Sequence, residues 1–319
     1  MEGTKIKDLQ VNQDLIGYYL VRESSLREGS NGSFLDLTLS DETGTVNAKI
    51  WKCDPLDGQK YTKGVLVKVM AKMIEYRGNL QMNINRIRPA QADDGVDIED
   101  FVESAPLRSE DMYDQVVSYA GKIEDGDIRK IVQFFLTEYK TKLLYYPAAK
   151  TIHHAIRGGL LFHMLKMLET AEAIALVYPS LSGDLLFAGV ILHDIEKVNE
   201  MESDRLGIAH YTMEGEMLGH LVMGARNVDR AARAMNIPEE KSILLQHIVI
   251  SHHQRLEYGS PKVPMVVEAE VLHHIDMIDA RIYGFNDALA GLKDGTMSDR
   301  VFALDNRKVY KVPREQNNE

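Results

Sequence analysis

The chain has 319 residues, of which 45% are hydrophobic and 27% are charged, a composition typical of a soluble globular protein with about two domains. Its net charge of −11 argues against a protein that coats nucleic acid non-specifically. No run of about 18 apolar residues is present, the N-terminus lacks the apolar core of a signal peptide, and the single cysteine, Cys53, excludes an internal disulfide framework. These features predict a cytoplasmic protein with no membrane partner.

The charge is distributed unevenly along the chain. Residues 1–90 hold 13 Lys and Arg against 11 Asp and Glu, a net charge of about +2, whereas residues 91–319 hold 24 against 37, about −13. A random fluctuation would explain the first value. The alternative is that the N-terminal part meets phosphates, while some of the acidity elsewhere comes from metal ligands and solvated helix faces.

Up to about Pro89, apolar and polar residues alternate with the period of β-strands. The clearest alternation covers residues 33–39, 46–50, 65–69 and 80–84. Turn residues at 41–44 and 77–79 separate these runs. Five or so short strands in this stretch predict an all-β barrel of the OB type over residues 1–90, with an SH3-like barrel as the alternative.

The outward face of these strands carries a pattern that suits single-stranded nucleic acid. If the leucines and valines fill the barrel, five residues point outward: Phe34, Lys49, Trp51, Gln81 and Asn83. Bases stack on aromatic rings while ammonium groups meet phosphates, so we predict that these five residues bind a strand. Alternatively, Phe34 and Trp51 pack under a loop or against the second domain.

Residues 91–107 are acidic, contain Gly95 and Pro106 and lack sustained periodicity, so we predict a linker. Beyond it the apolar pattern takes the period of helices. The predicted helices cover residues 127–146, 159–178, 184–192, 211–235, 238–251 and 266–283. We therefore predict an all-α bundle over residues 108–312 and a frayed tail over residues 313–319.

All 11 histidines lie between residues 153 and 274, in the helical half. Histidine is rarely fully buried unless it has a partner, so this clustering needs a cause. The predicted helices supply, in order, His163, His193-Asp194, His220, His252-His253 and Asp276. Imidazole with carboxylate suits divalent Mn, Fe, Co or Zn, with Mg as a further candidate, and the two oxygens of Asp194 could bridge two ions.

The context of the His193-Asp194 pair makes the signal more specific. An isolated His-Asp pair arises often by chance. Here an apolar run delivers the pair to a helix end, and Lys197 follows the aspartate by three residues. With His163 before the pair and Asp276 after it, the series predicts a divalent metal site.

The ordered series His, His-Asp, His, His and Asp resembles the HD-domain metal-dependent phosphohydrolases, an all-α fold, over roughly residues 150–290. With an OB-type domain in front, and with the segment HHAIRGGLLFH at 153–163, the whole chain resembles the YhaM family of 3′-to-5′ exoribonucleases. That resemblance implies manganese-assisted hydrolysis of single-stranded RNA, and possible action on DNA, with release of nucleoside monophosphates. Direction, product and preferred metal come from the family alone.

The resemblance also implies roles for individual residues. It assigns primary metal ligation to His163, His193, Asp194 and Asp276, and a second ion to His220 with His252 or His253. Asp194 and Lys197 are the predicted catalytic residues: a bridged ion pair would activate water, and Lys197 would neutralise charge that develops on phosphorus. Glu196 departs from the family, in which glycine often precedes the lysine, and this departure puts a local phosphate contact in doubt.

Three further side chains are candidates near the site. Arg157 and Arg255 are predicted phosphate contacts, with ordinary surface or ion-pairing roles as the alternative. Asp279 follows Asp276 by three residues on the same helical face, so either carboxylate could bind the metal. The motif favours Asp276 and leaves a supporting role for Asp279.

Two other functions fit parts of the sequence. An HD enzyme that acts on a small nucleotide, such as a cyclic dinucleotide or a nucleoside triphosphate, would use the same metal site and keep the barrel for regulation or assembly. Such an enzyme needs no base-stacking face. A nucleic-acid-binding factor with a vestigial metal centre fits less well, because every HD position holds a suitable ligand. The preference for RNA or DNA and the formation of a homo-oligomer stay open.

Overall fold

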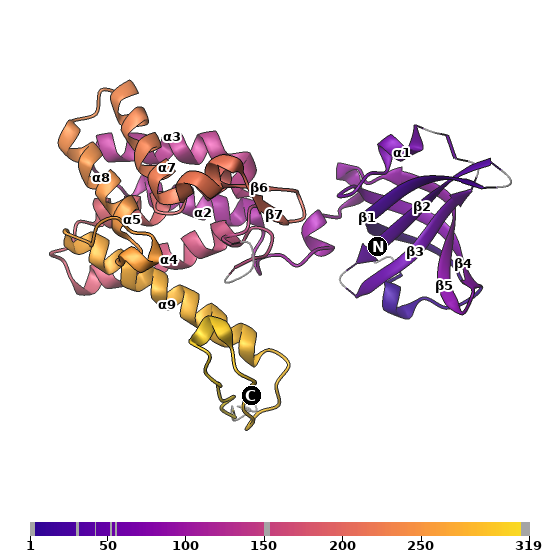
Figure 1. Cartoon of the computed structure of the whole chain (residues 1–319). Helices are drawn as coiled ribbons and strands as arrows, with labels where there is room; N and C mark the ends of the chain where they lie inside the picture. Colours follow the sequence, from indigo (N-terminus) through magenta and orange to yellow (C-terminus); the bar gives the residue numbers. More distant parts are fainter. Residues whose placement is uncertain are drawn as a thin grey trace. The chain divides into compact units, whose positions relative to one another are not determined.

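The computed structural model describes residues 4–29, 32–41, 43–51, 53–54, 56–149 and 154–313 (Figure 1). The chain forms two compact units, one of residues 1–104 with 204–206 and one of residues 105–203 with 207–319. No helix in the described ranges is both long and apolar enough to cross a membrane. Of the predicted frayed tail, only Pro313 lies within the described residues.

The first unit contains a closed five-stranded barrel with the strand order β1-β2-β3-β5-β4. Its elements are η1 (Ile6–Asp8), β1 (Asp14–Gly29), β2 (Gly32–Asp41), β3 (Gly44–Trp51), α1 (Asp57–Lys60), β4 (Leu66–Tyr76) and β5 (Asn79–Pro89). Neighbouring strands are antiparallel except β3 and β5, which are parallel. The predicted all-β barrel is confirmed.

Strand β1 closes the barrel because it is long enough to pair on both sides. Its first part, from Asp14 to Leu20, pairs with β4, and the remainder pairs with β2. The register with β2 shifts between Val21 and Glu23, and such a bulge bends a strand between two partners. The bulge also interrupts the two-residue period, which is why the alternation pattern misses this strand.

The barrel interior is filled by the apolar face that the alternation predicts. Leu35, Leu37 and Leu39 of β2 are buried, and so are Val67 and Val69 of β4. Each such side chain stabilises the fold by about 1.5–3 kcal/mol when it leaves water. This burial fixes which face of each strand points inward, and it leaves the other face to solvent.

The acidic segment predicted as a linker is ordered over its first part. It contains the turns η2 (Ala92–Asp94) and η3 (Ile98–Asp100). Asp94 accepts hydrogen bonds from both terminal nitrogens of Arg88 at 2.7 Å and from the Tyr18 hydroxyl at 2.9 Å. The Arg88 guanidinium holds the pKa of Asp94 well below its usual range. This carboxylate, together with the apolar packing of Phe101 and Val102 against Leu20, ties the segment to the barrel.

The second unit is helical, and most of its helices were predicted (Figure 1). They are α2 (Ser109–Gly121), α3 (Gly126–Leu143), α4 (Gly159–Val177), α5 (Gly183–Leu192), α6 (Lys197–Glu200), α7 (Met213–Ala234), α8 (Glu239–Ser251) and α9 (Val267–Leu289), with 3-10 turns η4 (Leu256–Tyr258) and η5 (Phe302–Leu304). The predicted helical bundle is confirmed, and a small antiparallel hairpin, β6 (Met201–Ser203) and β7 (Ala209–Tyr211), lies between its helices.

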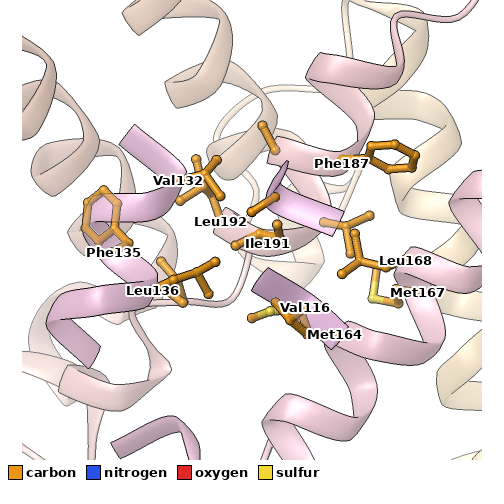
Figure 2. Close-up of a cluster of buried hydrophobic side chains, with 14 of the residues drawn as sticks. Val116, Val132, Phe135, Leu136, Met164, Met167, Leu168, Phe187, Ile191 and Leu192 are labelled. Carbon is orange, nitrogen blue, oxygen red and sulfur yellow. The ribbon is translucent and has the colours of Figure 1, made fainter. Parts of the chain in front are cut away.

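Helix α5 is the centre of this unit. Its residues 186–192 are all buried, and it contacts α2, α3, α4, α8 and α9. Figure 2 shows Phe187, Ile191 and Leu192 among side chains such as Val116 of α2 and Met164 of α4. A helix that is apolar all round must be buried. The residues that follow α5 therefore begin deep inside the unit.

Gly189 allows α5 to approach two neighbouring helices. A Cβ atom at this position would lie 2.8 Å from Cγ2 of Ile248 in α8 and 3.4 Å from Cδ2 of Leu272 in α9. The first distance is too short for two carbon atoms, so a side chain at Gly189 would force α8 away. Close packing at this level sets the spacing of the three helices.

Candidate metal centre

Side chains from five parts of the helical unit meet at one buried point. These are His163 of α4, His193 and Asp194 after α5, His220 of α7, His252 after α8 and Asp276 of α9. Asp194 is central, because its Oδ1 lies 3.2 Å from His220 Nε2 and 3.7 Å from His252 Nε2. Its Oδ2 lies 3.3 Å from His193 Nε2. His163 Nε2 lies 3.5 Å from Asp276 Oδ1.

Two of the imidazoles are oriented by backbone carbonyl groups. His193 Nδ1 donates to the carbonyl of Val190, and His252 Nδ1 donates to the carbonyl of Val249, both at 2.8 Å. A carbonyl oxygen only accepts, so each ring carries its proton on Nδ1 and presents the Nε2 lone pair to the centre. Histidines that bind metals are held in this way.

Two other imidazoles are oriented by carboxylates. His163 Nδ1 lies 2.6 Å from Asp279 Oδ2, and His220 Nδ1 lies 3.0 Å from Glu200 Oε1. The same Asp279 oxygen lies 2.8 Å from His154 Nε2. Burial raises the pKa of Asp279, but its bonds to His154 and His163 outweigh that effect and lower it. Asp279 thus stands behind His163, in the position of a supporting group.

A break in helix α7 turns His220 toward the centre. Gly219 has φ 69° and ψ 158°, a conformation that favours glycine. Glu200 Oε1 accepts the backbone N–H of His220 at 3.0 Å as well as the ring N–H. One carboxylate oxygen therefore holds both the amide and the ring. Sequence reasoning missed Glu200, because nothing nearby in the chain shows that it contacts a histidine 20 residues later.

The donor atoms at the centre fit a bound cation. In the part of the chain that the structure describes, His193 Nε2, His220 Nε2, His252 Nε2 and Asp194 Oδ1 are buried and make no hydrogen bond. Buried polar atoms normally have partners, and a cation would give these atoms one. Among the described residues, four groups of three side chains have ligand atoms within 4.8 Å of one another. Two of these groups have no member in common with each other: His163, His193 and Asp276 form one, and His220, His252 and His253 form the other. Imidazole and carboxylate together suit a divalent transition metal.

Lys197 places a positive charge beside the carboxylate of Asp194. Its Nζ donates to Asp194 Oδ2 at 2.6 Å, and both side chains are nearly enclosed. Burial raises the pKa of Asp194, but the charges of Lys197 and His193 hold it well below its usual range. Burial lowers the pKa of Lys197, but Asp194 more than offsets this and raises it. The pair is therefore ionised at neutral pH.

A cleft of about 870 Å³ opens onto this centre. Its lining includes Asp194, Lys197 and Asp276 from the centre and the rings of Tyr211, Tyr258, Tyr283 and Phe302. This volume is typical of a site for a small molecule or for the end of a polymer. A ligand can therefore reach the ionised pair from solvent.

The two arginines predicted as phosphate contacts are not among the residues described as lining this cleft. Arg157 is buried and donates to Ser109 Oγ at 3.4 Å. Arg255 is exposed and pairs with Glu257 at 3.3 Å. Arg281 of α9 lines the cleft instead. The prediction used closeness in sequence, whereas the turn before α4 places Arg157 inside the unit.

Glu196, the departure from the HD pattern, does not line the cleft in the described structure. It is buried, and it accepts a hydrogen bond from the Tyr139 hydroxyl at 2.8 Å and another from Asn199 Nδ2 at 2.9 Å. These bonds link α3 to the segment that carries Lys197. Glu196 is therefore a structural group, and it leaves the phosphate side of the site unchanged.

On the barrel, the predicted aromatic residues gather around one lysine. Phe34 and Trp51 are cross-strand partners with ring centroids 5.1 Å apart, and Trp51 is 51% exposed. Lys49 Nζ lies 5.0 Å, 5.4 Å and 5.9 Å from the rings of Phe34, Trp51 and Tyr76. The prediction missed Tyr76. In β4 the buried residues alternate with exposed ones, and Tyr76 falls on the exposed face, so the alternation pattern could have identified it. The group offers rings and positive charge together, as single strands require.

Gln81 is a correction to the predicted binding face. Its side chain is buried, and its Nε2 donates to Asn47 Oδ1 at 2.6 Å, because the parallel neighbour β3 places Asn47 directly beside it. Asn83, two residues later, stays partly exposed and accepts a hydrogen bond from Trp51 Nε1 at 2.9 Å. Gln81 therefore serves the sheet, while Asn83 belongs to the aromatic group.

Two family models match the chain. One, described as an OB-fold nucleic acid binding domain, covers residues 21–90, and the other, described as an HD domain, covers residues 160–281. The first decides between the OB-type and SH3-like barrels that the strand pattern left open. The second spans every candidate metal ligand from His163 to Asp276.

Curated relatives match almost the whole chain. The protein named 3′-5′ exoribonuclease YhaM from Halalkalibacterium halodurans is 41% identical over 303 residues, which cover 95% of this chain and 94% of the relative. Proteins of the same name from Geobacillus sp. (41% over 303 residues, 95% and 93%) and Shouchella clausii (42% over 307 residues, 96% of each) are similar to the same extent. The likeness therefore includes both units.

Proposed function

Because this chain belongs to the YhaM family of 3′-5′ exoribonucleases, we propose that it is a metal-dependent exonuclease that shortens single-stranded RNA from its 3′ end and releases nucleoside monophosphates. One observation carries the proposal beyond family membership. Buried imidazole and carboxylate atoms without hydrogen bonds, in the described residues, meet at the end of an open cleft.

The donor set contains two groups, and Asp194 lies within 4 Å of members of both, His193 in one and His220 and His252 in the other. His163, His193 and Asp276 would hold one divalent ion, and His220, His252 and His253 would hold the other. His253 Nδ1 donates to the carbonyl of Tyr258 at 2.8 Å, so His253 offers its Nε2 as His252 does. When bound, such ions activate water and neutralise charge on phosphate oxygens. Manganese is the metal that we favour.

Lys197 and Asp194 contribute directly to the chemistry. Asp194 holds the Lys197 ammonium at 2.6 Å, and both line the cleft in which a phosphodiester would lie. A fixed positive charge stabilises the negative charge that develops on phosphorus during hydrolysis. Burial makes this stabilisation stronger than it would be in water.

The barrel supplies the means to hold a long strand. Phe34, Trp51 and Tyr76 present rings for bases, while Lys49 and Asn83 present polar groups beside them. Such a surface binds single strands with little dependence on sequence. An enzyme for a small nucleotide has no use for it, so this face favours a polymeric substrate. We place this activity in the cytoplasm.

A product ladder tests the proposal. The purified protein, in the presence of Mn²⁺, is incubated with one RNA strand labelled at its 5′ end or at its 3′ end. The 5′ label should pass through progressively shorter fragments, and the 3′ label should appear at once in a mononucleotide. Chelation of the metal should stop both changes. Intact RNA together with hydrolysis of a cyclic dinucleotide or a nucleoside triphosphate would favour the small-nucleotide alternative.

A further inference from the structure

The cleft extends well beyond the metal centre along helix α9. Asp276 lies at its metal end, and Arg281, Gly284 and Asp287 line it further on. From Asp276 to Asp287 the helix rises by about 16 Å, at about 1.5 Å per residue. Stacked nucleotides are separated by about 3.4 Å, so the cleft has room for several nucleotides of a strand.

Phe302 stands on the wall of this cleft with 90% of its surface exposed. An exposed ring alone carries little information, because isolated apolar side chains are common on protein surfaces. The position of Phe302 is informative, because the same cleft contains Asp194 and Lys197. A ligand that fills the cleft from the metal centre outward therefore contacts this ring.

The turn that carries Phe302 is fixed against α9 (Figure 1). Leu304 is fully buried, and it lies so close to Gly284 that a Cβ atom there would be 3.2 Å from Leu304 Cδ2. Arg281 and Asp305 form an ion pair at 2.9 Å beside this contact. The buried Leu304 and the ion pair of Asp305 therefore hold the turn that carries Phe302 against α9.

The segment around Phe302 is basic, although the helical half is acidic. Residues 291–313 hold 5 Lys and Arg against 3 Asp and Glu, whereas residues 91–319 carry a net charge of about −13. Local positive charge attracts the phosphate backbone of a nucleic acid. These five basic residues are not among the described residues that line the cleft. The tyrosines at 211, 258 and 283 do line it, so several rings occur together there.

We infer that Phe302 forms a base-stacking subsite of the nuclease. It stacks on a base upstream of the 3′ terminus, while the terminal phosphodiester lies at the metal centre. This inference rests on the proposed function, and it adds a contact that only a strand of several nucleotides can make. When the RNA becomes too short to reach the ring, it loses the contact, and very short products are degraded less efficiently.

Steady-state kinetics of the full-length protein with Mn²⁺ test this inference. Phe302→Ala is compared with the parent on a long single-stranded RNA and on a diribonucleotide. We expect KM for the long strand to rise about tenfold, as loss of one stacked base would cause, with little change in kcat. KM for the diribonucleotide should stay the same. Phe302→Trp, which keeps a stacking surface, should restore the parent KM.

A matched control is Tyr178→Ala, which removes a ring that is 60% exposed at the end of α4. It should behave as the parent on both substrates. An unchanged KM of Phe302→Ala on the long strand would overturn the inference, and so would an equal rise on the diribonucleotide, because stacking upstream cannot affect that substrate. A parent protein that leaves RNA intact would overturn the proposed function itself.

Discussion

The metal centre and the barrel face differ in how their side chains are satisfied. Among the described residues of the centre, four buried ligand atoms face one another without hydrogen bonds. On the barrel, the candidate nucleic-acid residues contact one another at the surface. The imidazoles of the centre are already oriented by carbonyls and carboxylates. On the barrel, Trp51 bonds to Asn83, and Lys49 lies near three rings.

The two sites therefore differ in how their side chains are arranged before a ligand binds. In the metal centre the imidazoles are oriented while their inward-facing atoms make no hydrogen bond in the described structure, so a bound ion adds interactions that the protein alone cannot make. The barrel face is complete without a ligand, so a strand must exchange internal contacts for new ones, which limits the net gain per residue. We therefore expect substitutions in the centre to abolish activity and substitutions on the barrel to change affinity by a limited factor.

The largest effect is expected at Asp194, which lies within 4 Å of histidines in both groups of ligands. Asp194→Asn should abolish RNA hydrolysis and sharply reduce bound metal, because an amide is a much weaker ligand for a divalent cation and leaves Lys197 without its counter-charge. Activity is measured on a labelled strand, and metal content is measured by mass spectrometry. Asp229→Asn, on a partly exposed carboxylate of α7, is the control. Full activity of the Asp194 variant would refute the metal centre.

The next effect concerns the number of ions. His220→Ala should leave about one metal per chain where the parent binds two, because His163, His193 and Asp276 form a separate set. The stoichiometry is measured at saturating Mn²⁺. His274→Ala is the control, because its imidazole is 63% exposed on α9. A parent that binds a single ion at saturation would contradict the binuclear arrangement but not the HD fold.

Glu200 should have a smaller effect, because it acts only through His220. Glu200→Gln removes the charged acceptor of the ring N–H, and loss of such a supporting group typically weakens metal affinity by about 10–100-fold. Titration calorimetry with Mn²⁺ should show this change in one of the two binding steps. Glu202→Gln, an exposed carboxylate in β6, should leave both steps as they are in the parent.

On the barrel, Trp51→Ala should weaken the binding of single-stranded RNA by about tenfold, which corresponds to about 1.4 kcal/mol. Binding is measured by fluorescence anisotropy on metal-free protein, so that the strand stays intact. Ile16→Ala, which removes an exposed side chain from β1, is the matched control. Equal affinity of the two variants would show that the aromatic group does not hold the strand.

The smallest effect concerns stability rather than function. Bonds from Arg88 lower the pKa of Asp94, so the carboxylate stabilises the fold at pH values above its unfolded pKa of about 3.9. That contribution is lost as the pH falls through the folded pKa. Asp94→Asn should therefore unfold at lower urea concentration than the parent at pH 7, and the difference should shrink in acid. A constant difference between neutral and acidic pH would contradict this account.

Hydrophobic periodicity predicted the elements in which residues alternate regularly between the core and solvent. The helical period located α3, α4, α7, α8 and α9, which present apolar faces to a common core, and the continuous apolar run of α5 located the helix at the centre of that core. The order of histidine and aspartate residues identified a set of side chains that the structure brings together, since each follows or lies on a helix that packs at the centre. Conversely, the hairpin β6–β7 is too short to produce a clear alternation.

The misses share one cause, which is contact between residues distant in sequence. Gln81 follows the outward period of β5, but Asn47 on the neighbouring strand covers it. Glu200 contacts His220 only because of the break at Gly219. Arg157 lies close to His163 in sequence, but its guanidinium reaches Ser109 instead. No pattern within a single element reports such contacts.

The apolar layer around Gly189 has a consequence for the choice of metal. Its three members each precede a candidate ligand by four residues: Gly189 precedes His193, Ile248 precedes His252 and Leu272 precedes Asp276. Residues four apart lie above one another on a helix, so this layer lies one turn beneath the donor atoms. The volume of the side chains in this layer then sets how far apart the ligands lie. The distance between the ligands in turn sets the ionic radius that they accommodate. Metal selectivity could be altered there without changing a single ligand.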